Sequence, residues 1–203
     1  MEKSFIENAL KTMDFKIRDT DKNLIKFVNM CKYGVANEEK PLLLTVGLQS
    51  CVALIAYEKN FSFLAHINLY NYQEKDFEVN KRKEVTRCKK VNDLYNEISK
   101  VKDKINGTIN IGLVLGVTPE KEHENRKIIE NDLLKMFEKL RKYNISARRL
   151  PDMNSFSFIL DSRIGSIIHD GVENQNRITQ NIQEKDQIIK DDKRNGLMED
   201  YIL

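Results

Sequence analysis

Two apolar runs, separated by a short polar segment, constrain the fold of this chain more than any other feature. The first run is Cys51-Val-Ala-Leu-Ile-Ala-Tyr57 and the second is Phe61-Ser-Phe-Leu-Ala-His-Ile-Asn-Leu69, with Glu58-Lys-Asn60 between them. Each run has the length of a β-strand, and a polar break of this size fits a tight turn. The sequence therefore predicts a β-hairpin over 51–69.

Strand and helix patterns alternate along the rest of the chain. Short apolar runs indicate strands, and apolar residues at helical spacing indicate helices. The expected elements are a short helix over 2–15, a strand over 41–46, a loop at 47–50, a polar loop over 71–90, helices over 91–105 and 125–143, strands over 109–117 and 145–150, and a second hairpin over 155–168. We expect an α+β fold, with mixed β-sheet layers built around two hairpins and flanked by helices.

Composition limits the class of protein. The chain has 203 residues, of which 40% are hydrophobic and 32% charged, the balance of a soluble globular protein. Beyond Gly171 the sequence becomes polar with isolated isoleucines, so we expect a domain over 1–171 and a polar C-terminal extension over 172–203. A net charge of +3 gives no reason to expect a nucleic-acid partner.

The sequence also argues against several kinds of site. No apolar stretch approaches the roughly 18 residues of a membrane span, and the polar start is unlike a signal peptide, so we expect a cytoplasmic protein without membrane insertion. Cys31, Cys51 and Cys88 are an odd number at unrelated spacings. A disulfide framework, a metal site and a cofactor are therefore not expected.

Cys51 has the setting of a nucleophile, because it lies where a glycine-containing loop enters a strand. If Glu58 and Lys59 form the hairpin turn, Cys51 lies directly opposite His66, and a register shifted by two would still keep both on one face. A nearby imidazolium would lower the pKa of the thiol and make it a nucleophile towards a carboxamide. The alternative is that Cys51 is simply a small buried hydrophobe, the usual role of a lone cysteine in an apolar run.

A catalytic histidine normally has a third group that orients it. Thr45, Gln49 and Ser50 are the polar candidates beside the pair, and backbone N–H groups of the same loop could bind an oxyanion. Taken alone, Thr45 is better explained as a β-branched residue in a strand.

Two segments resemble the CheD family of chemoreceptor glutamine deamidases. Thr45-Val-Gly-Leu-Gln-Ser-Cys51-Val is similar to the family's Thr-Leu-Gly-Leu-Gly-Ser-Cys-Val signature, and Phe63-Leu-Ala-His66-Ile-Asn-Leu69 to its Gly-Leu-Ala-His-x-Met-Leu segment. The resemblance extends from about Lys26 to Asp170 and assigns 25–36, whose periodicity would also suit a helix, as a strand.

The resemblance implies a function. It makes Cys51 the nucleophile, His66 the general base and Thr45 the residue that orients His66, in a cytoplasmic enzyme of chemotaxis that converts protein glutamine to glutamate and ammonia. Its implied partners are chemoreceptor helices and a regulatory phosphatase. The departures from the pattern include Gln49 in place of a glycine and Tyr70 in place of a proline.

Two rival functions remain open at this stage. The same fold could serve as a non-catalytic binding or regulatory module, because fold does not prove activity, or the enzyme could deamidate an unrelated protein. The basic cluster from Lys81 to Lys90 could dock an acidic helix, although a solvated loop is the simpler explanation.

Overall fold

The computed structural model describes residues 23–69, 75–105, 107–116, 124–155 and 157–169. Within these ranges the fold is α+β, dominated by strands. The elements are β1 (Ile25–Phe27), β2 (Tyr33–Val35), β3 (Leu42–Thr45), β4 (Cys51–Glu58), β5 (Phe61–Asn68), β6 (Phe77–Val79), β7 (Val85–Cys88), α2 (Lys89–Val101), the 3₁₀ turn η2 (Lys102–Lys104), β8 (Thr108–Leu115), α3 (Glu124–Arg141), β9 (Ser146–Arg149), β10 (Met153–Asn154), β11 (Phe158–Asp161) and β12 (Ser166–His169).

The described strands form three sheets. The largest has the order β10-β8-β4-β5-β2, with β9 also pairing with β8, and the second has the order β1-β3-β11-β12. Strands β6 and β7 form a separate two-stranded sheet. In β4 and β5 nearly every residue is buried, because these strands are central and covered on both faces, which accounts for their mostly apolar sequences.

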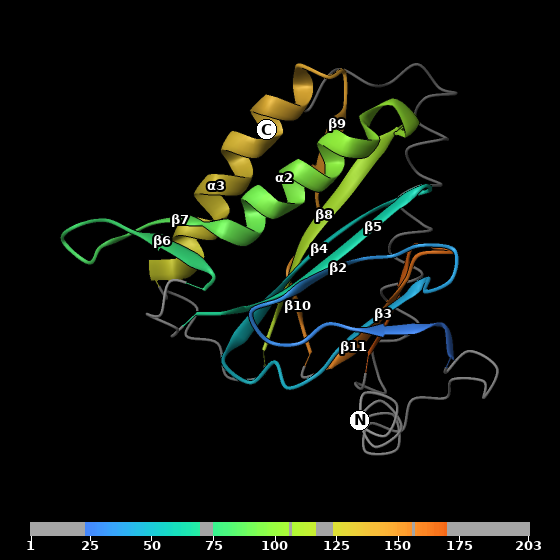
Figure 1. The fold of residues 1–203 in the computed structure, drawn as a ribbon, viewed down its shortest axis with the longest axis horizontal. Helices are drawn as coiled ribbons and strands as arrows, with labels where there is room; N and C mark the ends of the chain where they lie inside the picture. The colour runs from blue at the N-terminus through green and yellow to red at the C-terminus, as the bar shows by residue number, and fades with distance from the viewer. Residues whose placement is uncertain (1–22, 70–74, 106, 117–123, 156, 170–203) are drawn as a thin grey trace. The chain divides into compact units, whose positions relative to one another are not determined.

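The two larger sheets and the helices form three layers (Figure 1). On one face of the six-stranded sheet, residues such as Leu54 and Phe63 pack in one apolar cluster with Leu94 of α2 and Leu133 of α3. The opposite face packs on the four-stranded sheet through a second cluster. Its members include Cys51, Ala53, Ile55 and Leu64 of β4 and β5, Leu43 of β3, and Phe158 and Leu160 of β11. Cys51 thus lies on the face of its sheet that meets the other sheet.

The layered α+β arrangement expected from the sequence is confirmed. Both expected hairpins form, as β4–β5 and β11–β12, and both expected helices are present with ends that differ by a few residues. The helix expected over 2–15 and the boundary expected at 171 lie outside the described residues and stay predictions.

The prediction of one strand over 25–36 is wrong, because the segment forms two short strands that belong to different sheets. β1 pairs with β3, and β2 pairs with β5. Between them the chain crosses from one sheet to the other, with Val28 N–H donating to Leu44 O at 2.8 Å and Cys31 N–H donating to His66 O at 2.8 Å. Cys31 has a left-handed backbone, with φ of 62°, which turns the chain at this point.

The polar loop expected over 71–90 is also wrong, because it contains the hairpin β6–β7. The Asn80 side chain organises the turn by accepting the N–H groups of Arg82 at 2.9 Å and Glu84 at 3.0 Å. Short polar strands lack the alternation of apolar and polar residues by which a strand is recognised in a sequence. Hydrogen bonds from a side chain in the turn stabilise such a hairpin locally. The two-residue strand β10 was not expected for the same reason.

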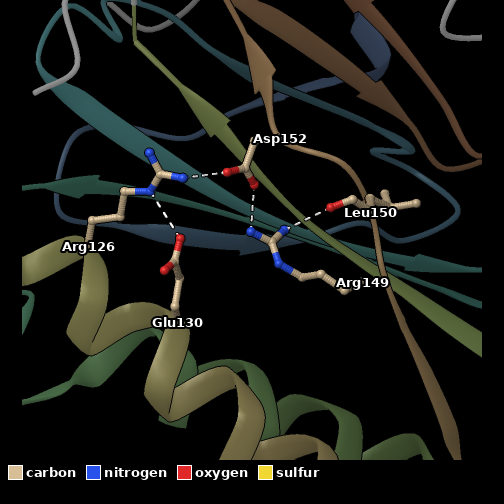
Figure 2. A network of polar contacts seen from close by, with 5 residues as sticks. All are labelled: Arg126, Glu130, Arg149, Leu150 and Asp152. Atoms are coloured by element: carbon tan, nitrogen blue, oxygen red, sulfur yellow. Dashed lines mark hydrogen bonds and ion pairs between the residues drawn. The ribbon is translucent and has the colours of Figure 1, made fainter. Parts of the chain in front are cut away.

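An ion-pair network ties α3 to the segment between β9 and β10 (Figure 2). Asp152 accepts from Nη2 of Arg126 and Nη2 of Arg149, each at 2.6 Å, and Arg126 Nε lies 3.0 Å from Glu130 Oε1. This segment leads into β10, which pairs with the end of β8 at Leu115. The network therefore fixes the outer edge of the sheet close to the point where β8 meets the start of β4.

Candidate active site

The register of the β4–β5 hairpin determines which residues face one another. β4 ends at Glu58 and β5 begins at Phe61, so the turn is Lys59-Asn60 rather than Glu58-Lys59. The Asn60 side chain holds this turn by donating to Lys104 O at 3.2 Å, and its N–H donates to Glu58 Oε2 at 2.9 Å. The expected pairing of Cys51 with His66 is therefore wrong by two residues.

Cys51 pairs with Asn68, and His66 pairs with Ala53. A shift by two residues keeps side chains on the same face, so Cys51 and His66 are diagonal neighbours across the hairpin. Such neighbours lie about 7–8 Å apart at the backbone, within reach of an aromatic ring. Both side chains are buried, Cys51 at 5% and His66 at 2% exposure.

Thr45 contacts His66 from the other sheet. Thr45 Oγ1 lies 2.9 Å from His66 Nδ1 and also 2.9 Å from the carbonyl oxygen of Val28. A hydroxyl has one proton, and the carbonyl can only accept, so the hydroxyl donates to Val28 O and accepts from the imidazole. His66 then carries its proton on Nδ1 and a lone pair on Nε2.

The lone pair on Nε2 is the basic atom of the ring. Nε2 is buried and has no hydrogen-bond partner in the part of the chain that the structure describes. A buried polar atom without a partner is costly, and a catalytic role is one explanation for such an atom. The lone pair on Nε2 therefore has no described protein donor and can accept a proton.

Burial controls the charge state of the pair. It raises the pKa of the Cys51 thiol to about 11, with further increases from Cys31 and Asp76, and it lowers the pKa of His66 to about 4. The expected depression of the thiol pKa is therefore wrong, because desolvation between the two sheets raises the pKa of the thiol and a neutral His66 supplies no positive charge to lower it. At neutral pH both groups are uncharged.

The loop before Cys51 is held by close backbone packing. Gly47 has a left-handed φ of 75°, Gln49 N–H donates to Gly47 O at 2.8 Å, and Leu48 is fully buried. A Cβ atom on Gly116 would lie only 1.9 Å from Leu48 O, so only glycine fits beside this loop. Of the two other polar candidates, Gln49 is exposed and Ser50 is half-buried.

Two further residues at the site were not identified from the sequence. Asp76 is fully buried, accepts the Asn68 N–H on Oδ2 at 3.0 Å, and has Lys90 Nζ 3.8 Å from Oδ1. Asn68 is half-buried and its Nδ2 lies 3.5 Å from Met30 Sδ. The two-residue step from His66 could have indicated Asn68, because strand side chains alternate, whereas nothing in the local sequence indicates Asp76.

The described residues contain no group of three or more His, Cys, Asp or Glu side chains arranged to hold a metal ion. Within those same ranges no helix is both long and apolar enough to cross a membrane. No protein-family model and no curated protein matches this chain. A functional assignment therefore depends on the residues and geometry of the site.

Proposed function

We propose that this protein is a cysteine-dependent protein-glutamine deamidase, with Cys51 as nucleophile, His66 as general base and Thr45 as the residue that orients His66. The observation that supports it best is the Thr45 hydroxyl, which accepts from His66 Nδ1 while donating to Val28 O. This contact leaves a lone pair on Nε2, on the same sheet face as the Cys51 thiol.

The proposed reaction proceeds through a thioester. His66 Nε2 takes the thiol proton as the Cys51 sulfur attacks the carboxamide carbon, and the resulting imidazolium protonates the departing nitrogen, releasing ammonia. His66 then removes a proton from water, whose oxygen attacks the thioester carbon. The product is glutamate, and the proton returns to the Cys51 sulfur.

The raised thiol pKa fits a proton transfer that accompanies attack rather than a preformed ion pair. Backbone N–H groups around Ser50 and Cys51 are the proposed oxyanion donors, because they adjoin the nucleophile at the start of β4. Gln49 belongs to the same loop and replaces a glycine of the family signature. Of the differences from that signature, it is the one most relevant to substrate entry.

The resemblance to the CheD family suggests the substrate. Under this proposal the protein is cytoplasmic, contributes to chemotaxis and deamidates glutamine on chemoreceptor helices, with a regulatory phosphatase as a further partner. The exposed basic residues of the β6–β7 turn, Lys81, Arg82 and Lys83, would steer an acidic helix towards the protein. The alternative substrate is a glutamine of an unrelated protein, which would be deamidated by the same chemistry.

Mass spectrometry of a glutamine-containing protein tests the proposal, because replacing an amide by a carboxylate changes the mass of the target peptide. The wild-type protein should produce this change together with ammonia, and Cys51→Ala and His66→Ala should each abolish both. Cys88→Ala is the matched control, since Cys88 packs in the cluster beneath the helices. Loss of activity in the control alone would contradict the assignment of Cys51.

A second candidate function is a non-catalytic binding module. The low exposure of both reactive side chains favours it, because an unreactive buried cysteine and histidine would look the same. One experiment distinguishes the two candidate functions. If Cys51→Ala binds and regulates a partner as well as wild type does, and wild type releases no ammonia from that partner, the binding module is correct.

A further inference from the structure

A cleft lies at the end of the β4–β5 hairpin that is opposite to the candidate active site. Cys51 is the first residue of β4, whereas the cleft includes the turn Lys59-Asn60 that follows the strand. The eight residues of β4 span about 24 Å, at roughly 3.4 Å per residue. The volume of the cleft is about 920 Å³, within the range of about 300–1,000 Å³ that is typical of small-molecule sites. It is therefore a separate site from the one that contains Cys51.

The segments that form the cleft are fixed to one another by backbone hydrogen bonds. Ala36 N–H donates to Ser62 O at 3.0 Å, which joins the loop after β2 to β5. Ser162 N–H donates to Pro41 O at 3.0 Å, which joins the β11–β12 turn to the start of β3. A site whose walls are already fixed loses less entropy when it binds a ligand.

Ser62 brings a buried hydroxyl to the lining of the cleft. The residue is 1% exposed, and its Oγ has no hydrogen-bond partner within the part of the chain that the structure describes. Leu64, two residues further along β5, packs in the cluster between the two large sheets, so Ser62 lies on this same face. A buried hydroxyl without a partner costs free energy, which a ligand oxygen would recover. The hydroxyl can turn towards such an oxygen, because one torsion sets its direction.

Two lysines supply positive charge to the cleft. Lys59 and Lys104 are exposed, and neither forms an ion pair with another described residue. Asn60 Nδ2 donates to Lys104 O at 3.2 Å, which holds the end of η2 beside the turn that carries Lys59. Two unpaired ammonium groups on adjoining segments favour an anionic ligand.

The other charged residues of the cleft do not cancel this charge. Arg163 lies 2.7 Å from Asp161 in an ion pair within the β11–β12 turn, so these two charges balance. Glu38 also lines the cleft, but it belongs to the loop between β2 and β3 rather than to the segments that carry the lysines.

We propose that this cleft binds a small phosphate monoester. A phosphate monoester carries a charge of about −1.5 to −2 near neutral pH, which matches the two ammonium groups of Lys59 and Lys104. Its oxygens accept hydrogen bonds, as the Ser62 hydroxyl requires. Apolar lining residues, among them Leu24 and Pro41, provide a surface for the organic part of the ligand. The site uses none of the residues of the proposed deamidase reaction.

An NMR titration of the full-length protein with phenyl phosphate tests the proposal. Backbone amide signals of the β4–β5 turn and of η2 should shift in a saturable manner. The Kd should increase with ionic strength, because the two lysines are exposed. Phenol lacks the charge and should not bind, and benzoate, with a single negative charge, should bind several-fold more weakly than phenyl phosphate.

Three substitutions test which residues hold the probe. Ser62→Ala should weaken the binding of phenyl phosphate about tenfold, since it removes one hydrogen bond to a charged group. The midpoint of thermal unfolding of this variant should not fall, because the hydroxyl has no described partner to lose. Lys59→Gln and Lys104→Gln should each weaken binding several-fold and reduce its dependence on ionic strength.

Lys127→Gln is the matched control, because Lys127 is an exposed lysine of α3 outside the cleft, and this variant should bind phenyl phosphate as wild type does. An equal loss in Lys127→Gln and Lys59→Gln would show general attraction to a basic protein and would overturn the proposal. The absence of saturable binding, benzoate bound as tightly as phenyl phosphate, or an unchanged Kd in Ser62→Ala would overturn it as well. Ammonia release plays no part in these measurements, so their outcome is independent of the deamidase function.

Discussion

The Thr45 hydroxyl joins the two large sheets at His66. Thr45 belongs to β3 of the four-stranded sheet and His66 to β5 of the six-stranded sheet, and their side chains meet at 2.9 Å. Because the same hydroxyl donates to Val28 O, it can only accept from the ring. One buried hydrogen bond thereby sets the tautomer of the proposed base and ties the packing of the sheets to the site.

Substitution of Thr45 should reduce activity by less than loss of the nucleophile. Thr45→Val keeps the shape of the side chain and removes the hydroxyl, which should lower kcat/KM by about 10- to 100-fold, the effect of one buried hydrogen bond worth about 1–3 kcal/mol. Thr45→Ser should recover part of this loss. Nitrogen NMR of His66 should show an Nδ1 proton in wild type and a mixture of tautomers in Thr45→Val. Identical spectra would contradict the orienting role.

His66 should make the protein less stable in mild acid. In the unfolded chain its pKa is near 6.5, and burial lowers it to about 4 in the folded protein, so the unfolded state binds more protons between these values. Stability therefore falls as pH decreases from 6.5 to 4, by about 3 kcal/mol in total for this residue.

Urea unfolding of wild type and His66→Gln at several pH values between 4 and 7 measures this contribution. The difference in free energy of unfolding between the two proteins should change across this range and stay constant above pH 7. A difference independent of pH would show that His66 titrates normally in the folded protein.

Periodicity and length were sufficient to predict the hairpins, the two helices and the layered fold, because the buried strands β4 and β5 are mostly apolar. The segment over 25–36 was not predictable from pattern alone. Its division depends on hydrogen bonds to Leu44 on one sheet and His66 on the other, which are contacts distant in sequence. Local sequence does not encode which sheet a short strand joins.

The contact between Thr45 and His66 was predictable from the sequence, and the register and charge state of the pair formed by Cys51 and His66 were not. Residue type and resemblance indicate Cys51, His66 and Thr45, and the expected contact between Thr45 and His66 is present. The register was wrong by two because Asn60, rather than Glu58, belongs to the turn. The thiol pKa was wrong in direction because burial depends on the second sheet, which no local pattern reports.

Cys51 should react slowly with alkylating reagents at neutral pH. Burial raises its pKa to about 11, so little thiolate is present at pH 7. Alkylation by iodoacetamide, followed on the Cys51 peptide by mass spectrometry, should accelerate about tenfold per pH unit between pH 7 and 10, because the thiolate is the reactive form. Rapid labelling that levels off near neutral pH would instead indicate a preformed thiolate–imidazolium pair, and His66→Ala would then abolish it.

Gly116 should be essential to the position of Cys51, although it lies 65 residues away in sequence. Its N–H donates to Cys51 O at 3.0 Å, and a Cβ atom here would lie 1.9 Å from Leu48 O and 2.3 Å from Gln49 O. Backbone atoms at such distances must move, so Gly116→Ala should displace the loop that precedes Cys51 and cost about 1–3 kcal/mol of stability, as overpacking does. The loss of activity should exceed the loss that reduced stability alone would cause, because a small displacement of the nucleophile disrupts the reacting geometry.

Gly107→Ala is the matched control for Gly116→Ala. The nearest atom to a Cβ at Gly107 is Glu58 Oε1 at 4.0 Å, so the methyl group has space and the variant should keep wild-type activity. Thermal unfolding and ammonia release should be measured on both variants. The comparison distinguishes the steric effect at Gly116 from the general effect of replacing a glycine by alanine. That general effect acts largely through the unfolded chain. A Gly116→Ala protein with wild-type stability and activity would show that the loop before Cys51 can move without consequence, and the proposed oxyanion donors around Ser50 and Cys51 would then lose their structural support.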